Sequence, residues 1–349
     1  MMTEIRRSED AVRALLALWG ESAREIRLID SSHGEDDIRE NYVIDRRLVL
    51  RVNSAPVLDD AALADLNRLI GRYRDFGIAA PRFLPLDGKD CYITHTPEGF
   101  TAYLSEYLDL TPADQLGLDT PQYRTLDEKI LRMTAEFAAR YKNVDLSAVY
   151  GMYSLFDLCP YDKANGYDEK QENCDLLCDA LREAGEPRLA EGLEQLNAAL
   201  RARLLRLYPR LPKCVFQGDE NGSNLCLNGR GEIIGIFDFN MAGTDVCVNY
   251  LANHALYLYD TDSETLKALS PEQLFAGLRT AAKEGRRIVD AHYPMSPEEQ
   301  EAYPLYLAIT ALFQWPVMCD YRKGLQDPAA RENVLGLLRR VMEEAGRLL

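Results

Sequence analysis

The segment that most constrains this chain is CVFQGDENGSNLCLNGRGEIIGIFDFN, residues 214–240. It contains two apolar runs, NLCL and IIGIFDF, separated by Asn228-Gly229, a dipeptide typical of tight β-hairpin turns. A hairpin returns its outer ends to the same side, so Asn224 and Asp238 are expected to lie close together. Asp219 lies in the loop just before the first strand. The sequence therefore predicts that three side-chain oxygens converge.

Converging carboxylate and amide oxygens are typical of a site for a hard cation such as Mg²⁺. A phosphoryl-transfer site needs such a metal for the phosphates and a base for the acceptor hydroxyl. The spacing D-x-x-x-x-N, followed by an Asp after an apolar run, fits that division of roles. A single Asp or Asn is more often a turn former. However, Asp238 is expected to sit inside an apolar strand, between two Phe residues, where an unpaired carboxylate would cost several kcal/mol.

Composition limits the classes of partner. The chain has 349 residues, 47% of them hydrophobic, which is enough for a sizeable core and two lobes. A formal net charge of -16 argues against a nucleic-acid groove and mildly favours a cationic small molecule, although acidic soluble proteins are common. Eight dispersed cysteines without a CxxC pair indicate a reducing compartment and no zinc site. With no signal peptide and no long apolar run, we expect a cytoplasmic location and no membrane span.

Hydrophobic periodicity indicates an α+β protein with two lobes. The first 108 residues read as strand-rich with one long internal helix, and the remainder as mostly helical. We therefore expect an N-terminal nucleotide-binding lobe over 1–108 and a catalytic and acceptor-binding lobe over 109–349. Trp19 and Trp315 are expected to anchor cores. The expected strands are 25–30, 41–53, 91–96, 100–110, 213–216, 224–227 and 233–239, and the expected helices are 8–19, 59–77, 125–144, 171–185, 187–208, 296–315 and 330–349.

The segment FQGDENGSN…GIFDFNMAG resembles the catalytic segment of the aminoglycoside phosphotransferase and choline kinase superfamily, including its homoserine kinase-like members. The usual pattern there is His-Gly-Asp-x-x-x-x-Asn followed by Ile-Asp-Phe/Trp. The resemblance implies a bilobal protein-kinase-like fold, with a small antiparallel sheet and a helical C-terminal lobe, that uses ATP and Mg²⁺. It also implies that Asp219 is the catalytic base and that Asn224 and Asp238 are metal ligands.

The same resemblance implies further nucleotide contacts. Arg51 in LVLRVN takes the place of the lysine that holds the ATP phosphates, and a guanidinium can make that contact. Asp65 on the following helix is the candidate for its partner acid. Main-chain groups of Glu106 and Leu108 in YLSEYLDL would contact adenine. The phosphate loop, without a glycine-rich motif, would consist of Ser31, Ser32, His33 and Gly34.

Two positions depart from the family pattern. Gln217 stands where relatives carry the first His of the motif, a residue thought to support the loop rather than to transfer a proton. Asn249 stands about where relatives carry an Asp before Leu-Ala. Both changes affect residues that would support the loop, and they leave Asp219, Asn224 and Asp238 in place.

The main hypothesis is an ATP-dependent kinase acting on a hydroxyl of a small molecule: a sugar, an amino alcohol, a homoserine-like amino acid or an aminoglycoside. The acceptor would lie between Asp219 and the helical lobe, with the insert at 111–190 shaping its pocket and Asp157, Tyr161 and Asp162 as candidates. A catalytically weak nucleotide-binding regulator of the same fold is the alternative. A metal-dependent phosphoesterase is a third reading, which leaves the N-terminal lobe unexplained. A homodimer is kept open as the assembly.

Overall fold

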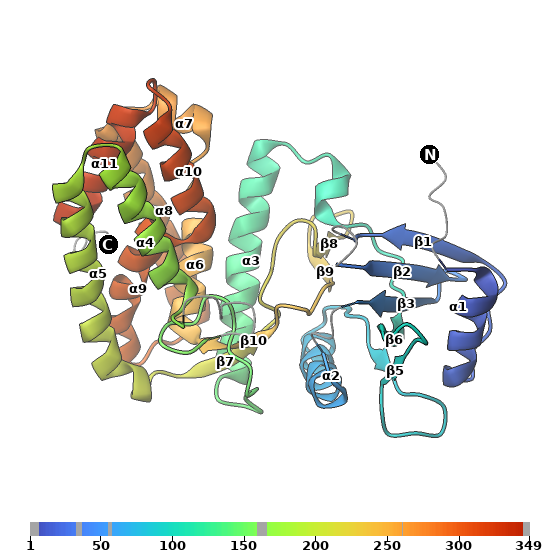
Figure 1. Ribbon diagram of the computed structural model, residues 1–349. Helices are drawn as coiled ribbons and strands as arrows, with labels where there is room; N and C mark the ends of the chain where they lie inside the picture. The colour runs from blue at the N-terminus through green and yellow to red at the C-terminus, as the bar shows by residue number, and fades with distance from the viewer. Residues whose placement is uncertain (1–6, 33–36, 55–57, 159–165, 260, 345–349) are drawn as a thin grey trace. The chain divides into compact units, whose positions relative to one another are not determined.

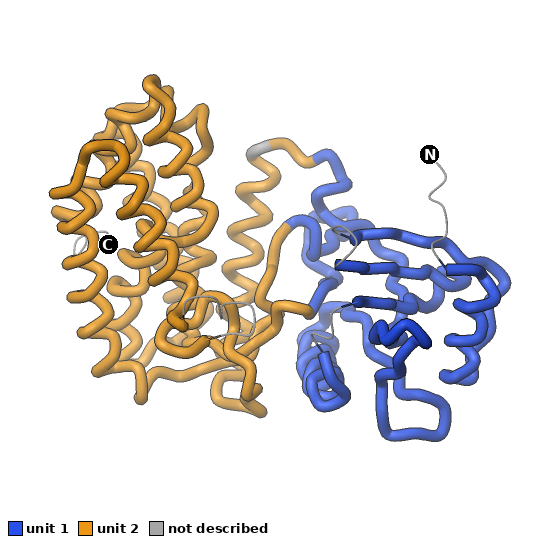
Figure 2. Tube along the Cα trace, in the orientation of Figure 1, with its two compact units in different colours: residues 1–117, 222–239 blue, residues 118–221, 240–349 orange. Residues whose placement is uncertain are grey.

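The chain divides into two compact units. The computed structural model describes residues 7–32, 37–54, 58–158, 166–259 and 261–344 (Figure 1). Unit 1 comprises Met1–Gly117 and Gly222–Phe239, and unit 2 comprises Leu118–Asn221 and Asn240–Leu349 (Figure 2). The polypeptide therefore passes from one unit to the other three times.

Unit 1 is built on a six-stranded antiparallel sheet with strand order β1-β2-β3-β6-β4, in which β5 also pairs with β6. In β3, Leu48, Leu50 and Val52 are buried and alternate with more exposed neighbours, as expected for a strand with one face on a core. The elements of the unit are α1 (Glu9–Leu16), η1 (Ala17–Trp19), β1 (Ile26–Asp30), β2 (Arg39–Ile44), β3 (Leu48–Asn53), α2 (Asp60–Asp75), β4 (Phe83–Leu84), β5 (Ile93–His95), β6 (Thr101–Glu106), η2 (Ala113–Leu116), β8 (Leu225–Leu227) and β9 (Ile233–Ile236).

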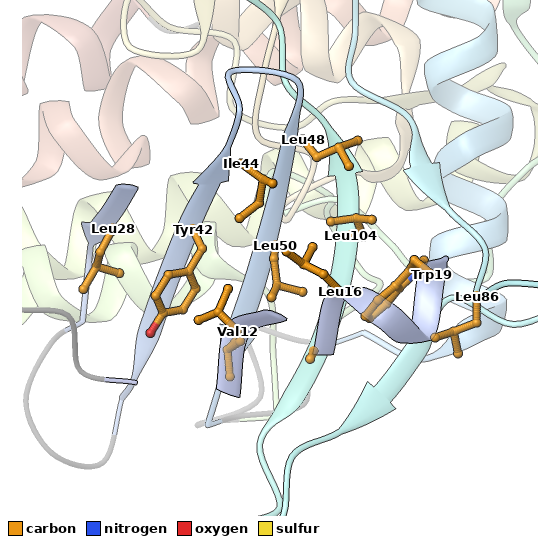
Figure 3. Packing of buried hydrophobic residues seen from close by; sticks show 12 residues of the cluster. Val12, Leu16, Trp19, Leu28, Tyr42, Ile44, Leu48, Leu50, Leu86 and Leu104 are labelled. Carbon is orange, nitrogen blue, oxygen red and sulfur yellow. The ribbon is translucent and has the colours of Figure 1, made fainter. Parts of the chain in front are cut away.

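The core of unit 1 forms where α1 covers the sheet (Figure 3). Val12 and Leu16 on α1 pack in one cluster with Leu50 and Leu104, and all four side chains are fully buried. Trp19 joins the same cluster, and its indole Nε1 donates a hydrogen bond of 3.0 Å to the carbonyl of Leu84. Trp19 is therefore the core anchor that the sequence predicts.

Unit 2 is mostly helical. A two-stranded antiparallel ladder, β7 with β10, pairs Phe216 with Gly243 and Lys213 with Val246. Trp315, at the start of α10, is 49% exposed, so the prediction that it anchors a core is wrong. The elements are α3 (Thr120–Tyr141), α4 (Glu169–Glu183), α5 (Pro187–Leu207), η3 (Tyr208–Arg210), β7 (Lys213–Phe216), β10 (Gly243–Val246), α6 (Cys247–Leu256), α7 (Ser263–Ala268), α8 (Pro271–His292), α9 (Pro297–Phe313), α10 (Trp315–Gln326) and α11 (Arg331–Glu344).

The division into units differs from the predicted boundary at 108/109. Unit 1 extends to Gly117 and takes in the hairpin β8–β9. The physical reason is backbone pairing: Ala79 donates to the carbonyl of Ile234 at 2.9 Å and accepts from the N–H of Ile236 at 2.8 Å. At the other strand, Pro112 forms an isolated bridge with Cys226. The hairpin is thus held by residues that precede Gly117.

Within the described residues, no single helix has the length and hydropathy of a membrane span. The bent pair of α9 and α10 passes that test only when the two helices are taken together.

We expect Leu50→Ala to lower the free energy of unfolding of unit 1 by about 2–5 kcal/mol, because it leaves a cavity in the cluster of Figure 3. Chemical denaturation monitored by tryptophan fluorescence measures the change. Leu18→Ala is the matched control: its side chain is 44% exposed, and the loss should stay below about 1 kcal/mol. Equal losses for the two variants would contradict the assignment of the core.

Candidate active site

The hairpin predicted from the sequence is present in unit 1. Leu225 pairs with Ile236 across β8 and β9, and the turn closes with a hydrogen bond of 2.8 Å from Gly231 N–H to the carbonyl of Asn228. Beyond the strand ends, the N–H of Phe237 donates to the carbonyl of Asn224 at 2.7 Å. That bond places the backbone of Asn224 beside the residue that precedes Asp238, and so the hairpin brings these two candidate metal ligands together.

Asp238 lies beyond the end of β9 and is exposed, so the structure corrects the expectation that it sits within an apolar strand. Its φ is 49°, in the left-handed region that a residue with a Cβ adopts at a cost of about 1–3 kcal/mol. The next residue, Phe239, is 3% exposed and packs edge-on against Tyr73 of α2 with ring centroids 5.7 Å apart. Burial of Phe239 therefore holds the chain where Asp238 must turn.

Arg51 on β3 faces β6. Its Nη1 donates to the Oγ of Ser105 at 2.9 Å, and its guanidinium lies 6.0 Å from the ring centroid of Tyr103. Burial raises the pKa of Tyr103, the positive charge of Arg51 lowers it, and the negative charge of Asp238 raises it. The charges of Arg51 and Asp238 therefore act on the same hydroxyl in opposite directions.

Asp65 does not pair with Arg51. Its carboxylate binds Arg68, three residues further along α2, and 44% of its side chain is exposed. No hydrogen bond or ion pair joins Asp65 to Arg51 in the part of the chain that the structure describes. The short Asp side chain favours the neighbouring arginine on its own helix surface.

Ser31 and Ser32 follow the end of β1 and contact Arg39, the first residue of β2. Ser31 N–H donates to the carbonyl of Arg39 at 3.0 Å, and Ser32 Oγ accepts from Arg39 N–H at 2.8 Å. Ser32 N–H donates in turn to the carboxylate of Asp30. The other two residues of the predicted phosphate loop, His33 and Gly34, lie outside the described residues, as do the acceptor-site candidates Tyr161 and Asp162.

The segment predicted to contact adenine begins at the end of β6. The N–H of Glu106 donates to the carbonyl of Arg82 at 2.9 Å, and its carboxylate accepts from Arg74 Nη1 at 2.7 Å. Tyr107 N–H donates to the carbonyl of Arg47 at 2.8 Å. The N–H of Leu108 makes no hydrogen bond with another described residue, so it keeps a donor for a ligand.

Asp219 belongs to unit 2 and follows β7. Its N–H donates to the Oε1 of Gln217 at 2.7 Å, and its Oδ1 accepts from Asn221 Nδ2 at 2.7 Å. Gln217 is fully buried. The departure from the family pattern at this position therefore has a structural meaning: the amide of Gln217 holds the backbone of Asp219.

Gly218 fixes the same loop by its lack of a side chain. Its φ is +92°, and a Cβ there would overlap the carbonyl oxygen of Met241.

Asn249, the second departure from the family pattern, is also held by hydrogen bonds. Asn249 Nδ2 donates to the carbonyl of Tyr153 at 2.6 Å and to Asp245 Oδ1 and Oδ2 at 3.1 and 3.0 Å. Burial raises the pKa of Asp245 to about 7.

The donor set in unit 1 fits a divalent cation that is completed by phosphate. Asn224 and Asp238 supply an amide and a carboxylate oxygen, both ligands of hard cations. The described residues hold no group of three or more His, Cys, Asp or Glu side chains that could bind a metal alone.

The sheet-based unit, the hairpin and the helical unit define a kinase-like phosphotransferase fold, as predicted. The sequence matches the profile of the Phosphotransferase enzyme family (APH) over residues 39–283, more than half of the chain. The chain therefore belongs to this family, and it is a small-molecule kinase. The resemblance to aminoglycoside phosphotransferases and choline kinases is confirmed.

The chain is similar to several solved structures at low sequence identity. "Amicoumacin kinase hAmiN in complex with AMP-PNP, Ca2+ and Ami" is 12% identical, covers 97% of this chain and 93% of that chain, and has a TM-score of 0.50. A microcompartment-associated aminopropanol kinase is 10% identical with a TM-score of 0.49, covering 97% of both chains. Choline kinase from Cryptosporidium parvum Iowa II is 14% identical with a TM-score of 0.44, covering 97% of this chain and 93% of that one. No curated protein matches the chain.

We expect Gly218→Ala to lower the free energy of unfolding by about 1–3 kcal/mol and to reduce phosphotransferase activity, because the loop must move to relieve the overlap with Met241. Thermal and chemical denaturation measure the first effect, and a turnover assay measures the second. Gly229→Ala is the control, since a Cβ at that turn meets nothing within 4 Å. If Gly218→Ala were as stable and active as Gly229→Ala, the tight packing of this loop would be refuted.

Proposed function

We propose that this protein transfers the γ-phosphoryl group of ATP, in the presence of Mg²⁺, to a hydroxyl of a small molecule. The observation that carries the proposal is the backbone hydrogen bond from Phe237 to Asn224, because it pairs the chain at Asn224 with the residue that precedes Asp238, the other proposed metal ligand. Arg51 supports it, because β3 of the same unit carries a guanidinium that can bind phosphate. Family membership limits the chemistry to phosphotransfer.

The nucleotide would use groups that are present in unit 1. Leu108 offers its backbone N–H to adenine, and Arg51 offers a guanidinium to the phosphates. Asn224 and Asp238 would hold Mg²⁺, which, when bound, neutralises the negative charge on the transferring phosphoryl group.

Asp219 would accept the proton of the acceptor hydroxyl. Gln217 accepts from its backbone N–H and so holds the main chain, and Asn221 donates to its Oδ1 and so orients the carboxylate. A fixed base next to the acceptor lowers the entropic cost of reaching the transition state. An amino alcohol, a sugar, a homoserine-like amino acid and an aminoglycoside are all candidate acceptors. Magnesium dependence, a cytoplasmic location and a homodimer stay predictions.

A nucleotide-binding regulator with weak activity is the second candidate, favoured by one observation. Arg51 is hydrogen-bonded to Ser105 and has no acidic partner at Asp65. A regulator would bind ATP with Mg²⁺ and turn over none of the acceptors. The two experiments below separate these outcomes.

Millimolar ATP with Mg²⁺ should raise the melting temperature, since a ligand at a hundred times its Kd stabilises the folded state by about 2.7 kcal/mol. Asp238→Ala should lose the Mg²⁺-dependent part of this shift. Differential scanning fluorimetry with and without EDTA measures it. Asp90→Ala, which removes an exposed carboxylate of unit 1, should keep the full shift. If wild type showed no shift, both the kinase and the regulator would be excluded.

The decisive assay follows ATP consumption against a panel of hydroxyl compounds: choline and aminopropanol as amino alcohols, homoserine, hexoses and aminoglycosides. With an active acceptor in hand, Asp219→Asn should lower kcat by about 10²–10⁴-fold and leave the ATP-induced thermal shift intact. Asp179→Asn, an exposed change on α4, is the control. Full turnover by Asp219→Asn would refute the assignment of the base.

A further inference from the structure

Two tyrosines from different parts of unit 2 meet through their hydroxyl groups. The Oη of Tyr153, in the segment before α4, lies 3.3 Å from the Oη of Tyr257, at the end of α6. Both residues are half-buried, so part of each stays open to solvent. The pair has no part in the phosphotransfer steps described above.

The two hydroxyls hold one proton more than their contact uses. Burial raises the pKa of Tyr153 and Tyr257 above the ordinary value, so both are protonated at pH 7. Each hydroxyl carries one proton, and a hydrogen bond between the two uses one of them. Gln314 also acts on the hydroxyl of Tyr257, but its Oε1 accepts no hydrogen bond from any described residue. One proton of the pair therefore has no acceptor in the described part of the chain.

The pair lies near the loop that carries Asp219. Glu220, the next residue of that loop, has its Oε2 3.5 Å from the Nε2 of His254 on α6. The ring of His254 is 5.6 Å from the ring of Tyr257, measured between centroids. After burial, the negative charge of Asp219 is a further cause of the raised pKa of Tyr153 and of Tyr257. An acceptor that presents its hydroxyl to Asp219 therefore has the tyrosine pair as a neighbour.

Other side chains of unit 2 hold Tyr153 in place. Asn249 Nδ2 donates to its carbonyl at 2.6 Å, and the ring of Tyr250 lies 5.8 Å from its own ring. The ammonium of Lys170 is 4.9 Å from its ring centroid and donates to Asn253 Oδ1 at 2.8 Å. Asn249, Lys170 and Asn253 are all buried. A side chain that is fixed before the ligand arrives binds it at a lower entropic cost.

We propose that Tyr153 and Tyr257 are specificity-determining residues that bind the acceptor through a second oxygen atom, separate from the hydroxyl that is phosphorylated. The proton that the pair has to spare needs a lone pair, which an oxygen supplies and an ammonium group lacks. The inference rests on the proposed function of Asp219 as the base. It favours a sugar, an aminoglycoside or a homoserine-like amino acid over an amino alcohol with a single oxygen.

The wild-type enzyme provides the first test. The acceptor with the highest kcat/KM is compared with analogues that keep the reacting hydroxyl and each lack one other oxygen-bearing group. At least one analogue should lose about 5–10-fold in kcat/KM, the value of one neutral hydrogen bond. If choline or aminopropanol, each with one oxygen, were the best acceptor, this inference alone would be overturned. If no compound of the panel were phosphorylated, the proposed function would fail and the inference with it.

A double variant tests the two hydroxyls themselves. Tyr153→Phe combined with Tyr257→Phe removes both hydroxyls and keeps both rings, so the acceptor and the disfavoured analogue should have equal kcat/KM, with an unchanged KM for ATP. A purely structural role would lower both values alike and preserve their ratio. A preserved ratio, or a raised KM for ATP, would therefore refute the proposal.

Tyr141→Phe is the matched control, because this half-buried tyrosine of α3 lies toward the other end of β7 from Asp219. There the N–H of Asn143 donates to the carbonyl of Lys213, the first residue of β7, at 2.7 Å. The control should keep the wild-type ratio of the two kcat/KM values. Loss of the ratio in Tyr141→Phe would show that discrimination does not depend on the tyrosine pair. The wild-type comparison uses no variant, so it remains decisive even if the double variant does not fold.

Discussion

The structure depends on the two hydrogen bonds between the backbone of Ala79 and strand β9. They attach a hairpin from the middle of the chain to the first unit, using the N–H and the carbonyl of one residue that follows α2. Without them, neither Asn224 nor Asp238 would belong to the unit that holds Arg51. Gly235 completes the attachment, because a Cβ there would crowd the side chain of Leu110. Side-chain packing by Leu110, rather than backbone approach, favours glycine at this point.

The two sets of candidate residues are held by different means. In unit 1, Asp238 takes a left-handed backbone conformation that burial of Phe239 against Tyr73 enforces. In unit 2, Asp219 follows a glycine in the same region and is held by the amide of Gln217. Asp238 thus adopts a backbone conformation that costs free energy, whereas Asp219 follows a glycine that adopts positive φ without strain.

Local sequence rules predicted the features that depend on neighbours in the chain. Asn228-Gly229 indicated the hairpin, and alternation in LVLRVN indicated a half-buried strand. The single helix expected over 296–315 ends at Phe313, because Gln314 is extended and α10 begins after it. The apolar periodicity of the sequence continues across Gln314, so it does not indicate where the helix ends.

Features that depend on distant partners were beyond the sequence. Nothing local distinguishes Asp65, which pairs with Arg68, from an acid that reaches across to β3. The buried state of Glu220 depends on Thr134 and His254, from helices 86 and 34 positions away, and a charged residue in a polar loop is usually exposed. The role of Gln217 could not be predicted either, because its Oε1 accepts from the N–H of Asp219 only in the folded loop.

The chain crosses from one unit to the other three times, and this has a consequence for folding. The N-terminal sheet is synthesised early, but its hairpin arrives only after residue 239, so Ala79 must wait for partners more than 150 positions downstream. Contacts of such long sequence separation form slowly, because closing the intervening loop costs entropy before any contact repays it. A ribosome-bound chain that ends near residue 117 would therefore carry a sheet with unpaired backbone at Ala79. The candidate metal ligands Asn224 and Asp238 would join unit 1 only when most of the protein has been made.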